Sequence, residues 1–325
     1  MIRNGLTSCL AAFFGALLVT PFLTRVGWKI GALDVPTDGR RMHRYPVPRI
    51  GGLAVFACVL LTLVLFGNLA SMRLPVILGA SAMFLTGLAD DLFNLDAWIK
   101  LACQILCATV AVTAEEPLSW YAKFAAILWI VTLANAHNLI DGLDGLLAGT
   151  VVIEGAALGA ALSLSENGNT LLPLLLAAAF LGFRIYNRAP ATIFAGDCGS
   201  ETAGFLLGVC SLPLLFRPVW GVGWLSAPMI FAYPLTDLTA AVARRILRGK
   251  PLFGADRAHL HHRLCVTGIR QADCARLLHL LCAGVATVGV LLTVKHLSFF
   301  ASVACIVSVV FLLSVKQYVQ RHALP

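Results

Sequence analysis

Long runs of apolar residues, separated by short polar segments, set the pattern of this chain. Two of the clearest runs cover residues 53–67 and 277–294. A helix needs about 20 mostly apolar residues to cross a bilayer, whereas the strands of an outer-membrane barrel alternate apolar and polar residues. Because the runs are unbroken, the pattern indicates membrane-spanning helices rather than a barrel.

The positions of these runs predict an all-α, polytopic integral membrane protein with about 11 transmembrane helices. The expected spans are residues 5–24, 51–68, 74–90, 97–114, 120–137, 145–164, 170–187, 200–216, 222–241, 276–295 and 298–315. The polar loops between them are short except for residues 25–50 and 242–275. No internal repeat or separate soluble segment is visible, so we treat residues 1–325 as a single transmembrane domain.

The composition agrees with this class of protein. Hydrophobic residues make up 59% of the chain and charged residues only 12%, whereas a soluble domain carries about 25% charged residues. The ten cysteines are scattered and form no CxxC pair, which argues against a disulfide framework or a zinc site. These features exclude a soluble globular protein, a disordered chain and a disulfide-stapled secreted scaffold.

The net charge of +8 is distributed unevenly between the two sides of the predicted membrane protein. The loops after odd-numbered spans, with the C-terminal tail, hold 19 of the 24 Lys and Arg residues. By the positive-inside rule these loops face the cytoplasm, the N-terminus faces outside and the C-terminus is cytoplasmic. Because topology accounts for the positive charge, we expect no nucleic-acid partner.

Acidic residues gather on the same side, and the positive-inside rule does not explain them. A carboxylate at the centre of a spanning helix costs about 2.5–3.5 kcal/mol on insertion scales. Carboxylates at several helix ends must therefore face water, a cation or one another. Five polar segments, after spans one, three, five, seven and nine, thus predict that the chemistry lies on one cytoplasmic face.

Paired carboxylates end the third span in the sequence Gly87-Leu-Ala-Asp90-Asp91. Adjacent carboxylates repel each other, so a divalent cation or a basic group is expected beside them. Lys100 follows after one short loop and is such a group. A solvated helix end is the alternative interpretation.

Oxygen-bearing side chains recur every three residues at the junction of the fifth and sixth spans. Asn138, Asp141 and Asp144 have the spacing that projects them to one side of a helical turn. Oxygen ligands beside flexible glycines suit Mg²⁺ or Mn²⁺ better than zinc. A polar loop between spans is the alternative.

The segment before the eighth span places Asp197 between two glycines, shortly after Phe194. Glycine allows close approach of the backbone to a ligand, and the start of a helix favours an anion such as phosphate. An ordinary turn capped by Ser200 is the alternative.

Two basic loops complete the set. The longest loop contains a cluster of residues that resemble anion binders and proton donors. They are Asp256, Arg257, His259, His261 and His262. Zinc is disfavoured there, since no HExxH pattern occurs. The first cytoplasmic loop contains prolines and cations, among them His43 and Arg49, that suit a diphosphate or lipid headgroups. Surface charge that serves only topology is the alternative for both loops.

Together these motifs, from about Asp34 to Leu264, resemble the polyprenyl-phosphate N-acetylhexosamine-1-phosphate transferase family. The resemblance implies an eleven-span helical fold that forms one phosphosugar-transferase domain. It also implies a bacterial cytoplasmic (inner) membrane location, a cytoplasmic site and Mg²⁺ as cofactor, with Mn²⁺ as an alternative ion. The implied reaction transfers a sugar 1-phosphate from a UDP-N-acetylhexosamine to undecaprenyl phosphate and releases UMP. Membrane lipids are the implied surroundings, and a homodimer stays open.

Site roles follow from the motifs that match. Asp90 and Asp91 match the family's paired aspartates, and Asn138, Asp141 and Asp144 match its NxxDGxDG segment. His259, His261 and His262 match the HxHH form of the N-acetylglucosamine branch, and Phe194 matches an aromatic that lies against uracil. The expected catalytic residues are Asp90, Asp91, Asp141 and His259, and the expected metal ligands are Asn138 and Asp197. The expected substrate-binding residues are His43, Arg49, Lys100, Asn135, Asp144, Phe194, Asp256, Arg257, His261 and His262.

Departures from the family pattern and rival functions remain at this point. His137 and Glu201 stand where apolar residues are expected, which leaves the identity of the sugar open. Direct attack by the lipid phosphate and an aspartyl-phosphate intermediate both fit the residues. A transporter of an anionic substrate would need polar groups near the middle of the membrane, where Glu154 is the candidate. An intramembrane aspartyl protease is disfavoured because Asp90 and Asp197 each miss its GxGD pattern by one glycine.

Overall fold

A computed structural model describes residues 2–36, 45–68, 72–113, 118–218, 221–249, 251, 259–294 and 304. This part of the chain is mainly helical, with one short β-ribbon. The helices are α1 (Ile2–Ile30), α2 (Gly51–Leu65), α3 (Leu74–Phe93), α4 (Ala97–Val112), α5 (Trp120–Ile140), α6 (Leu146–Leu164), α7 (Leu171–Asn187), α8 (Gly196–Phe216), η2 (Gly223–Leu225), α9 (Ser226–Ile230), α10 (Ala232–Leu247), α11 (Leu260–Val266) and α12 (Gln271–Leu291).

Six of these helices are long and apolar enough to cross a membrane: α1, α3, α5, α6, α8 and α12. The pair η2–α9 and α10 adds a seventh candidate span, and α2, α4 and α7 are shorter apolar helices. The structure therefore supports a multi-pass helical membrane protein, whereas the count of about 11 spans stays a prediction. The expected span 298–315 lies, except for Ala304, outside the described residues.

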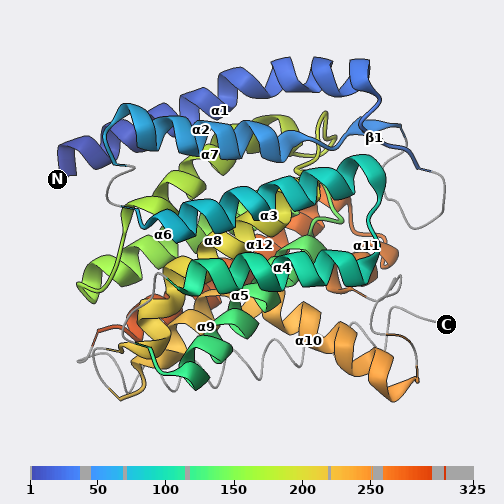
Figure 1. Ribbon diagram of the computed structural model, residues 1–325. Helices are drawn as coiled ribbons and strands as arrows, with labels where there is room; N and C mark the ends of the chain where they lie inside the picture. The colour runs from blue at the N-terminus through green and yellow to red at the C-terminus, as the bar shows by residue number, and fades with distance from the viewer. Residues whose placement is uncertain are drawn as a thin grey trace.

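The expected span over residues 222–241 is not one continuous helix, because the chain bends by 73° between α9 and α10. Pro234 lies at the start of α10 and cannot donate a hydrogen bond to the carbonyl of Ile230. A proline in this position favours a helix break just before it. The bend directs α10 away from the axis of α9 toward the end of the bundle that carries α11 (Figure 1).

The first predicted loop contains a small antiparallel ribbon that the apolar pattern did not indicate. Strand β1 (Leu33–Asp34) pairs with β2 (Val47–Pro48), with Leu33 opposite Pro48. Prolines favour extended backbone at and before their own positions. The ribbon lies at the end of the bundle where α3 ends and α11 lies (Figure 1).

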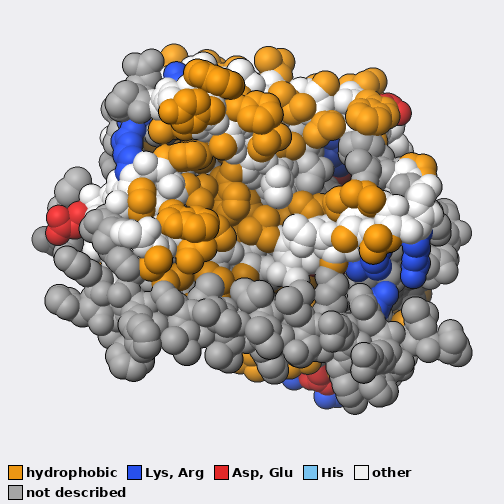
Figure 2. Space-filling model, turned by 90° about the horizontal axis from the view of Figure 1, so that it is seen from below, with side chains coloured by type: hydrophobic (Ala, Val, Ile, Leu, Met, Phe, Trp, Pro, Cys, Tyr) orange, Lys and Arg blue, Asp and Glu red, His pale blue; other side chains and the backbone are white. Residues whose placement is uncertain are grey.

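Helix α8 is the central helix of the bundle, since it packs on α2, α3 and α5 and most of its side chains are buried. In contrast, α1 lies at the edge and exposes Leu6, Leu10, Phe14, Leu18 and Phe22 at a spacing of four residues. Residues four apart share one face of a helix. Figure 2 shows hydrophobic side chains covering the middle of the molecule and charged ones mostly toward its ends. An apolar band of this kind suits contact with lipid.

Candidate functional site

The first turn of α8 is held by the buried carboxylate of Asp91. Asp91 Oδ1 accepts a hydrogen bond from the backbone N–H of Asp197 at 2.9 Å, and Oδ2 accepts one from that of Cys198 at 3.0 Å. The first N–H groups of a helix have no partner within the helix, and the helix dipole favours an anion there. No side chain of α8's own N-cap, Ala195, provides this cap. Asp91 supplies it from α3 and thereby fixes the position of Asp197.

Glycines allow the backbones of α2, α3 and α8 to meet around this cap. A Cβ added at Gly87 would lie 2.6 Å from the carbonyl carbon of Asp197, and one at Gly52 would lie 2.3 Å from the amide nitrogen of Gly199. Gly196 begins α8 with a φ of 72°, which glycine adopts at little cost. The glycines beside the aspartates therefore bring three helices together.

Lys100, in the first turn of α4, joins three carboxylates from α3 and α8. Its Nζ lies 3.0 Å from Asp90 Oδ2 and 2.7 Å from Glu201 Oε1, and it also forms an ion pair with Asp197. Asp90 is held in turn by the backbone N–H of Leu95, which donates to Oδ1 at 2.6 Å. We call Asp90, Lys100, Asp197 and Glu201 the lysine cluster. It places the paired aspartates of one motif beside the lone aspartate of another.

The segment from Asn138 to Asp144 is not helical throughout. Helix α5 ends at Ile140, and Asp141 is its C-cap. The prediction that Asn138, Asp141 and Asp144 project from one side of a helical turn is therefore wrong. Aspartate followed by glycine favours a turn over a continued helix, and this sequence occurs twice in succession here.

The two ends of this segment contact different parts of the protein. Asn138 Nδ2 lies 3.3 Å from Ser200 Oγ and 3.4 Å from Glu201 Oε1, beside the lysine cluster. Asp144 Oδ2 instead accepts a hydrogen bond from the backbone N–H of Ala191 at 2.9 Å. Asn138 thus lies beside the lysine cluster, and Asp144 holds the segment that follows α7.

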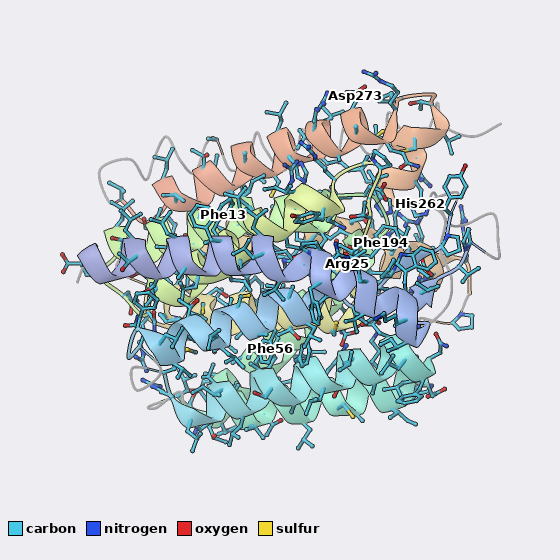
Figure 3. All side chains as sticks on the ribbon, turned by 90° about the horizontal axis from the view of Figure 1, so that it is seen from above. Phe13, Arg25, Phe56, Phe194, His262 and Asp273 are labelled. Carbon is cyan, nitrogen blue, oxygen red and sulfur yellow. The ribbon has the colours of Figure 1, made fainter. Side chains whose placement is uncertain are left out.

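Phe194 lies in that segment, which joins the β-ribbon to the start of α8. Its N–H donates to the carbonyl of Pro48 at 2.8 Å, and its own carbonyl accepts from the N–H of Gly51 at 2.9 Å. Asn187 Nδ2 closes the segment by donating to the carbonyl of Ile193 at 2.9 Å. Figure 3 shows Phe194 and His262 toward the same end of the helices, far from Phe13 in that view.

Arg49, an expected substrate-binding residue, contacts the last turn of α3. Its Nε donates to the carbonyl of Asp91 at 2.9 Å, and Nη2 donates to Asn94 Oδ1 at 3.1 Å and also to the carbonyl of Asp91. A cation at a helix C-terminus is favoured by the helix dipole. Arg49 therefore holds the end of the helix that carries the paired aspartates.

His259 is oriented by a buried carboxylate on α10. Its Nδ1 lies 3.0 Å from Asp237 Oδ2, while Asp237 Oδ1 accepts the backbone N–H of Leu260 at 3.0 Å. A carboxylate acceptor requires that Nδ1 carry the proton, which leaves Nε2 for a substrate. Asp237 thus fixes both the ring of His259 and the start of α11.

His261 joins the histidine segment to the Asp141–Gly142 turn. Its ring is fully buried, neither ring nitrogen has a hydrogen-bond partner, and it stacks on His259 with ring centroids 5.7 Å apart. A Cβ added at Gly142 would lie 2.7 Å from His261 Nε2. Burial, followed by the nearby His262, lowers the pKa of His261 to about 3. His261 is therefore neutral at pH 7. Its ring packs against Gly142, where a larger residue would clash with it.

Some expected site residues have other surroundings or lie outside the described residues. His43, Asp256 and Arg257 are outside them. Asn135 donates to Gln104 Oε1 at 2.6 Å and to the carbonyl of Val131 at 2.8 Å, so it links α5 to α4.

Asp237 and Glu201 are site residues that sequence reasoning did not assign. Glu201 lies one helical turn after Asp197, so both face the same way on α8. A charged residue within an apolar helix is itself a signal of function or pairing, and both residues carry that signal. The sequence does not indicate which residue pairs with each of them. The structure shows Lys100 beside Glu201 and His259 beside Asp237.

His137 on α5 and Glu154 on α6, two further ionisable groups inside apolar helices, pair with each other. His137 Nε2 lies 2.7 Å from Glu154 Oε2, and His137 Nδ1 lies 2.8 Å from the carbonyl of Leu133. Both side chains are fully buried. The transporter alternative rested on Glu154, which here is bonded within the core between α5 and α6.

The charge and donor atoms of the site fit a hard divalent cation. Among the described residues, no three His, Cys, Asp or Glu side chains surround one common point at metal-ligand spacing. Burial, and then the charges of Asp197 and Asp91, raise the pKa of Asp141 well above its usual value. Glu201 Oε2 is buried without a hydrogen-bond partner. The three carboxylates and one ammonium of the lysine cluster leave negative charge that oxygen-preferring Mg²⁺ would neutralise.

Comparison with known proteins places the chain in a family. Residues 73–214 match the sequence model of Glycosyl transferase family 4. The chain is 37% identical over 271 residues to the Bacillus subtilis (strain 168) protein named "Probable undecaprenyl-phosphate N-acetylglucosaminyl 1-phosphate transferase", covering 78% of this chain and 75% of the relative.

Two further relatives carry similar names. The decaprenyl-phosphate N-acetylglucosaminephosphotransferase of Mycobacterium leprae is 31% identical, over 81% of this chain and 76% of its own. The undecaprenyl-phosphate alpha-N-acetylglucosaminyl 1-phosphate transferase of Escherichia coli K12 is 26% identical, over 89% of this chain and 84% of its own. Residues 73–214, which match the family model, contain the lysine cluster and the Asn138–Asp144 segment. The chain therefore belongs to the polyprenyl-phosphate N-acetylhexosamine-1-phosphate transferase family, of the Glycosyl transferase family 4 type.

Proposed function

We propose that the protein transfers an N-acetylhexosamine 1-phosphate from its UDP derivative to undecaprenyl phosphate, the first membrane step of cell-envelope glycan synthesis. The lysine cluster is the observation that carries this proposal, because it gathers carboxylates and a cation at one end of the bundle. The names of the relatives support the reaction class, and they make UDP-N-acetylglucosamine the first donor to test. The membrane would be the bacterial cytoplasmic membrane, with the site on its cytoplasmic face.

The reaction has a simple balance of bonds. An unesterified oxygen of the lipid phosphate bonds to the phosphorus that carries the sugar, and the bond from that phosphorus to the bridging oxygen of UMP breaks. Both reactants are anions, so much of the barrier is charge repulsion and positioning. Basic groups and a cation at the site address that repulsion directly.

The proposed metal ligands are Asn138, Asp141 and Asp197. Bound Mg²⁺ would supply positive charge to the diphosphate and to the leaving UMP. Asp91 and Gly87 hold Asp197 at the start of α8, and Lys100 keeps the neighbouring carboxylates from repelling each other before a cation arrives. These roles use contacts that the protein makes without substrate.

The nucleotide half of the donor would lie under the histidine segment. His259, with its Nδ1 bonded to Asp237, presents Nε2 to the diphosphate as a hydrogen-bond donor when protonated. Phe194 is the aromatic available to stack on uracil, and Asp144 holds the segment that carries it. Lipid phosphate would approach from the membrane side, where Asp90 lies in the last turn of α3.

Removal of the metal or its ligands tests this assignment. Purified protein in detergent should transfer radiolabelled sugar phosphate to undecaprenyl phosphate, lose that activity with EDTA and regain it with excess Mg²⁺. Asp141→Ala and Asp197→Asn should each lower the rate by orders of magnitude.

Asp96→Ala is the matched control, because Asp96 is an exposed aspartate at the same end of the bundle that only caps α4 through the N–H of Trp98. Its loss should cost about 1 kcal/mol of helix stability and leave transfer nearly unchanged. Full activity in a folded Asp197→Asn protein would remove Asp197 from the site.

A further inference from the structure

A polar cavity lies at the end of the bundle opposite the lysine cluster. It has a volume of about 260 Å³ and lies between the first turn of α3, the turn joining α6 to α7 and the last turns of α8. Its lining includes Arg73, Val76, Asn167, Leu172, Val209 and Arg217. We call it the distal pocket.

The distal pocket lies one membrane thickness from the candidate site. Helix α8 begins beside the lysine cluster and ends beside the distal pocket, and it contains 21 residues. At 1.5 Å per residue its length is about 30 Å, which matches the hydrocarbon core of a bilayer. The distal pocket therefore faces the leaflet opposite to the one that the site serves.

The charge of the distal pocket is not explained by membrane topology. Two arginines line it, and none of the described residues that line it is acidic. Only five Lys or Arg residues belong to this predicted side of the membrane, and the positive-inside rule disfavours basic residues there. Two of the five lining one cavity, Arg73 and Arg217, favour an anionic ligand.

The walls of the distal pocket are held by specific contacts. Asn167 Nδ2 donates to the carbonyl of Arg217 at 2.6 Å and to that of Pro213 at 3.2 Å, which ties the α6–α7 turn to the end of α8. Gly168 has a φ of 101°, and a Cβ there would lie 3.1 Å from Pro213 Cγ. Asn169 Oδ1 accepts the N–H of Leu171 at 2.9 Å and so begins α7. The cavity is thus built by side-chain and backbone contacts.

The lining matches a molecule with a charged head and an apolar body. Guanidinium groups bind phosphate oxygens through paired hydrogen bonds, and the apolar floor of Val76, Leu172 and Val209 suits hydrocarbon. The volume is several times the roughly 30 Å³ that one water occupies in the liquid. We propose that the distal pocket binds the phosphate headgroup of an anionic phospholipid in the leaflet opposite the catalytic site.

Lipid binding to purified protein tests the proposal independently of sugar transfer. Native mass spectrometry should show phosphatidylglycerol binding about 30-fold more tightly than phosphatidylcholine, the scale expected for two basic residues near an anionic headgroup. The double variant Arg73→Gln, Arg217→Gln should lose this preference. Lys123→Gln, on α5 and outside the pocket lining, is the matched control and should keep it.

A second measurement uses the natural chain. Cys210 lines the distal pocket, so phosphatidylglycerol should slow its alkylation by N-ethylmaleimide at least several-fold, whereas phosphatidylcholine should not. An unchanged preference in the double variant, or equal protection by both lipids, would overturn the proposal. Protection by inorganic phosphate alone, at the same concentration, would show that the ligand is a soluble anion and would overturn the lipid assignment.

Discussion

Adjacent aspartates at the end of α3 have different surroundings, although the sequence gives them as a pair. Asp91 is buried and both of its oxygens accept backbone N–H groups of α8. Asp90 faces Lys100 and is partly exposed. The geometry therefore assigns a structural task to Asp91 and leaves Asp90 as the member of the pair that contacts the cation of the cluster.

The contact between Asp237 and His259 leads to a prediction about orientation. Asp237→Asn should lower kcat for sugar-phosphate transfer by about 10- to 100-fold, the range known for carboxylates that orient metal-bound histidines. KM for the UDP-sugar should change less, because the ring remains present. Steady-state kinetics with UDP-N-acetylglucosamine measures both parameters.

Rescue and coupling separate orientation from mere stability. Asp237→Glu, which keeps a carboxylate, should recover part of the rate. His259→Ala combined with Asp237→Asn should be no slower than His259→Ala alone, since partners in one contact are not additive. Additive losses in the double variant would show that the two residues act separately.

Burial of neutral His261 predicts a pH dependence of stability. Its pKa is about 3 in the folded protein and near 6.5 when unfolded. Between these values the unfolded state binds a proton that the folded state does not, so folding stability falls as pH is lowered below 6.5. The slope from one such residue approaches about 1.4 kcal/mol per pH unit.

His261→Leu removes this titration while keeping an apolar ring-sized group against Gly142. Thermal unfolding in detergent from pH 7 to pH 5 should show a smaller fall of Tm for His261→Leu than for the natural protein. Equal slopes for the two proteins would contradict the burial of a neutral histidine at this position.

At the scale of elements, the approach of α3 to α8 predicts that Gly87 tolerates no side chain. Gly87→Ala would place a Cβ 2.6 Å from the backbone of Asp197, so α8 must shift and the lysine cluster with it. Overpacking of this kind costs about 1–3 kcal/mol. Both Tm and transfer activity should fall.

Gly284→Ala is the matched control, because Gly284 lies within α12 with nothing within 4 Å of an added Cβ. Alanine there should leave activity unchanged and raise stability by about 0.5–1 kcal/mol, since glycine is a poor helix former. Normal activity in Gly87→Ala would show that the helices can separate without harm to the site.

Elements that depend on local pattern could be predicted from the sequence, and those that depend on distant partners could not. Apolar length located α1 to α8 and α12 to within several residues. The bend before α10 and the β-ribbon went unpredicted, since proline position decides them and apolar content does not. Likewise the motifs predicted Asp90, Asp141, Asp197 and His259 as candidate site residues. In contrast, the cap from Asp91 to α8 spans 106 residues of sequence and leaves no local signal.

At the scale of the whole molecule, the charge asymmetry predicts which end of the bundle faces the cytoplasm. In a protein whose ten natural cysteines are replaced, Arg248→Cys at the end of α10 should react with a membrane-impermeant maleimide only after cells are opened. Ser119→Cys, before α5 at the other end, should react in intact cells. Both positions are exposed in the structure, so accessibility to the reagent reports topology.

The opposite labelling pattern would place the lysine cluster outside the cell. That result would contradict a reaction that draws on a cytoplasmic nucleotide sugar, because no such donor is supplied from outside. One labelling result therefore bears on both the topology and the proposed function.

The cap that Asp91 provides also bears on how the protein is made. During synthesis Asp91 emerges well before α8, so its carboxylate is already in the membrane when the first turn of α8 arrives. Unpaired N–H groups are costly in lipid, and this helix start becomes satisfied only when α8 docks against α3. The hydrogen bonds to Asp91 thereby stabilise α8 in its native position relative to other positions among the newly made helices. One carboxylate thus favours correct assembly of the helices in the bilayer.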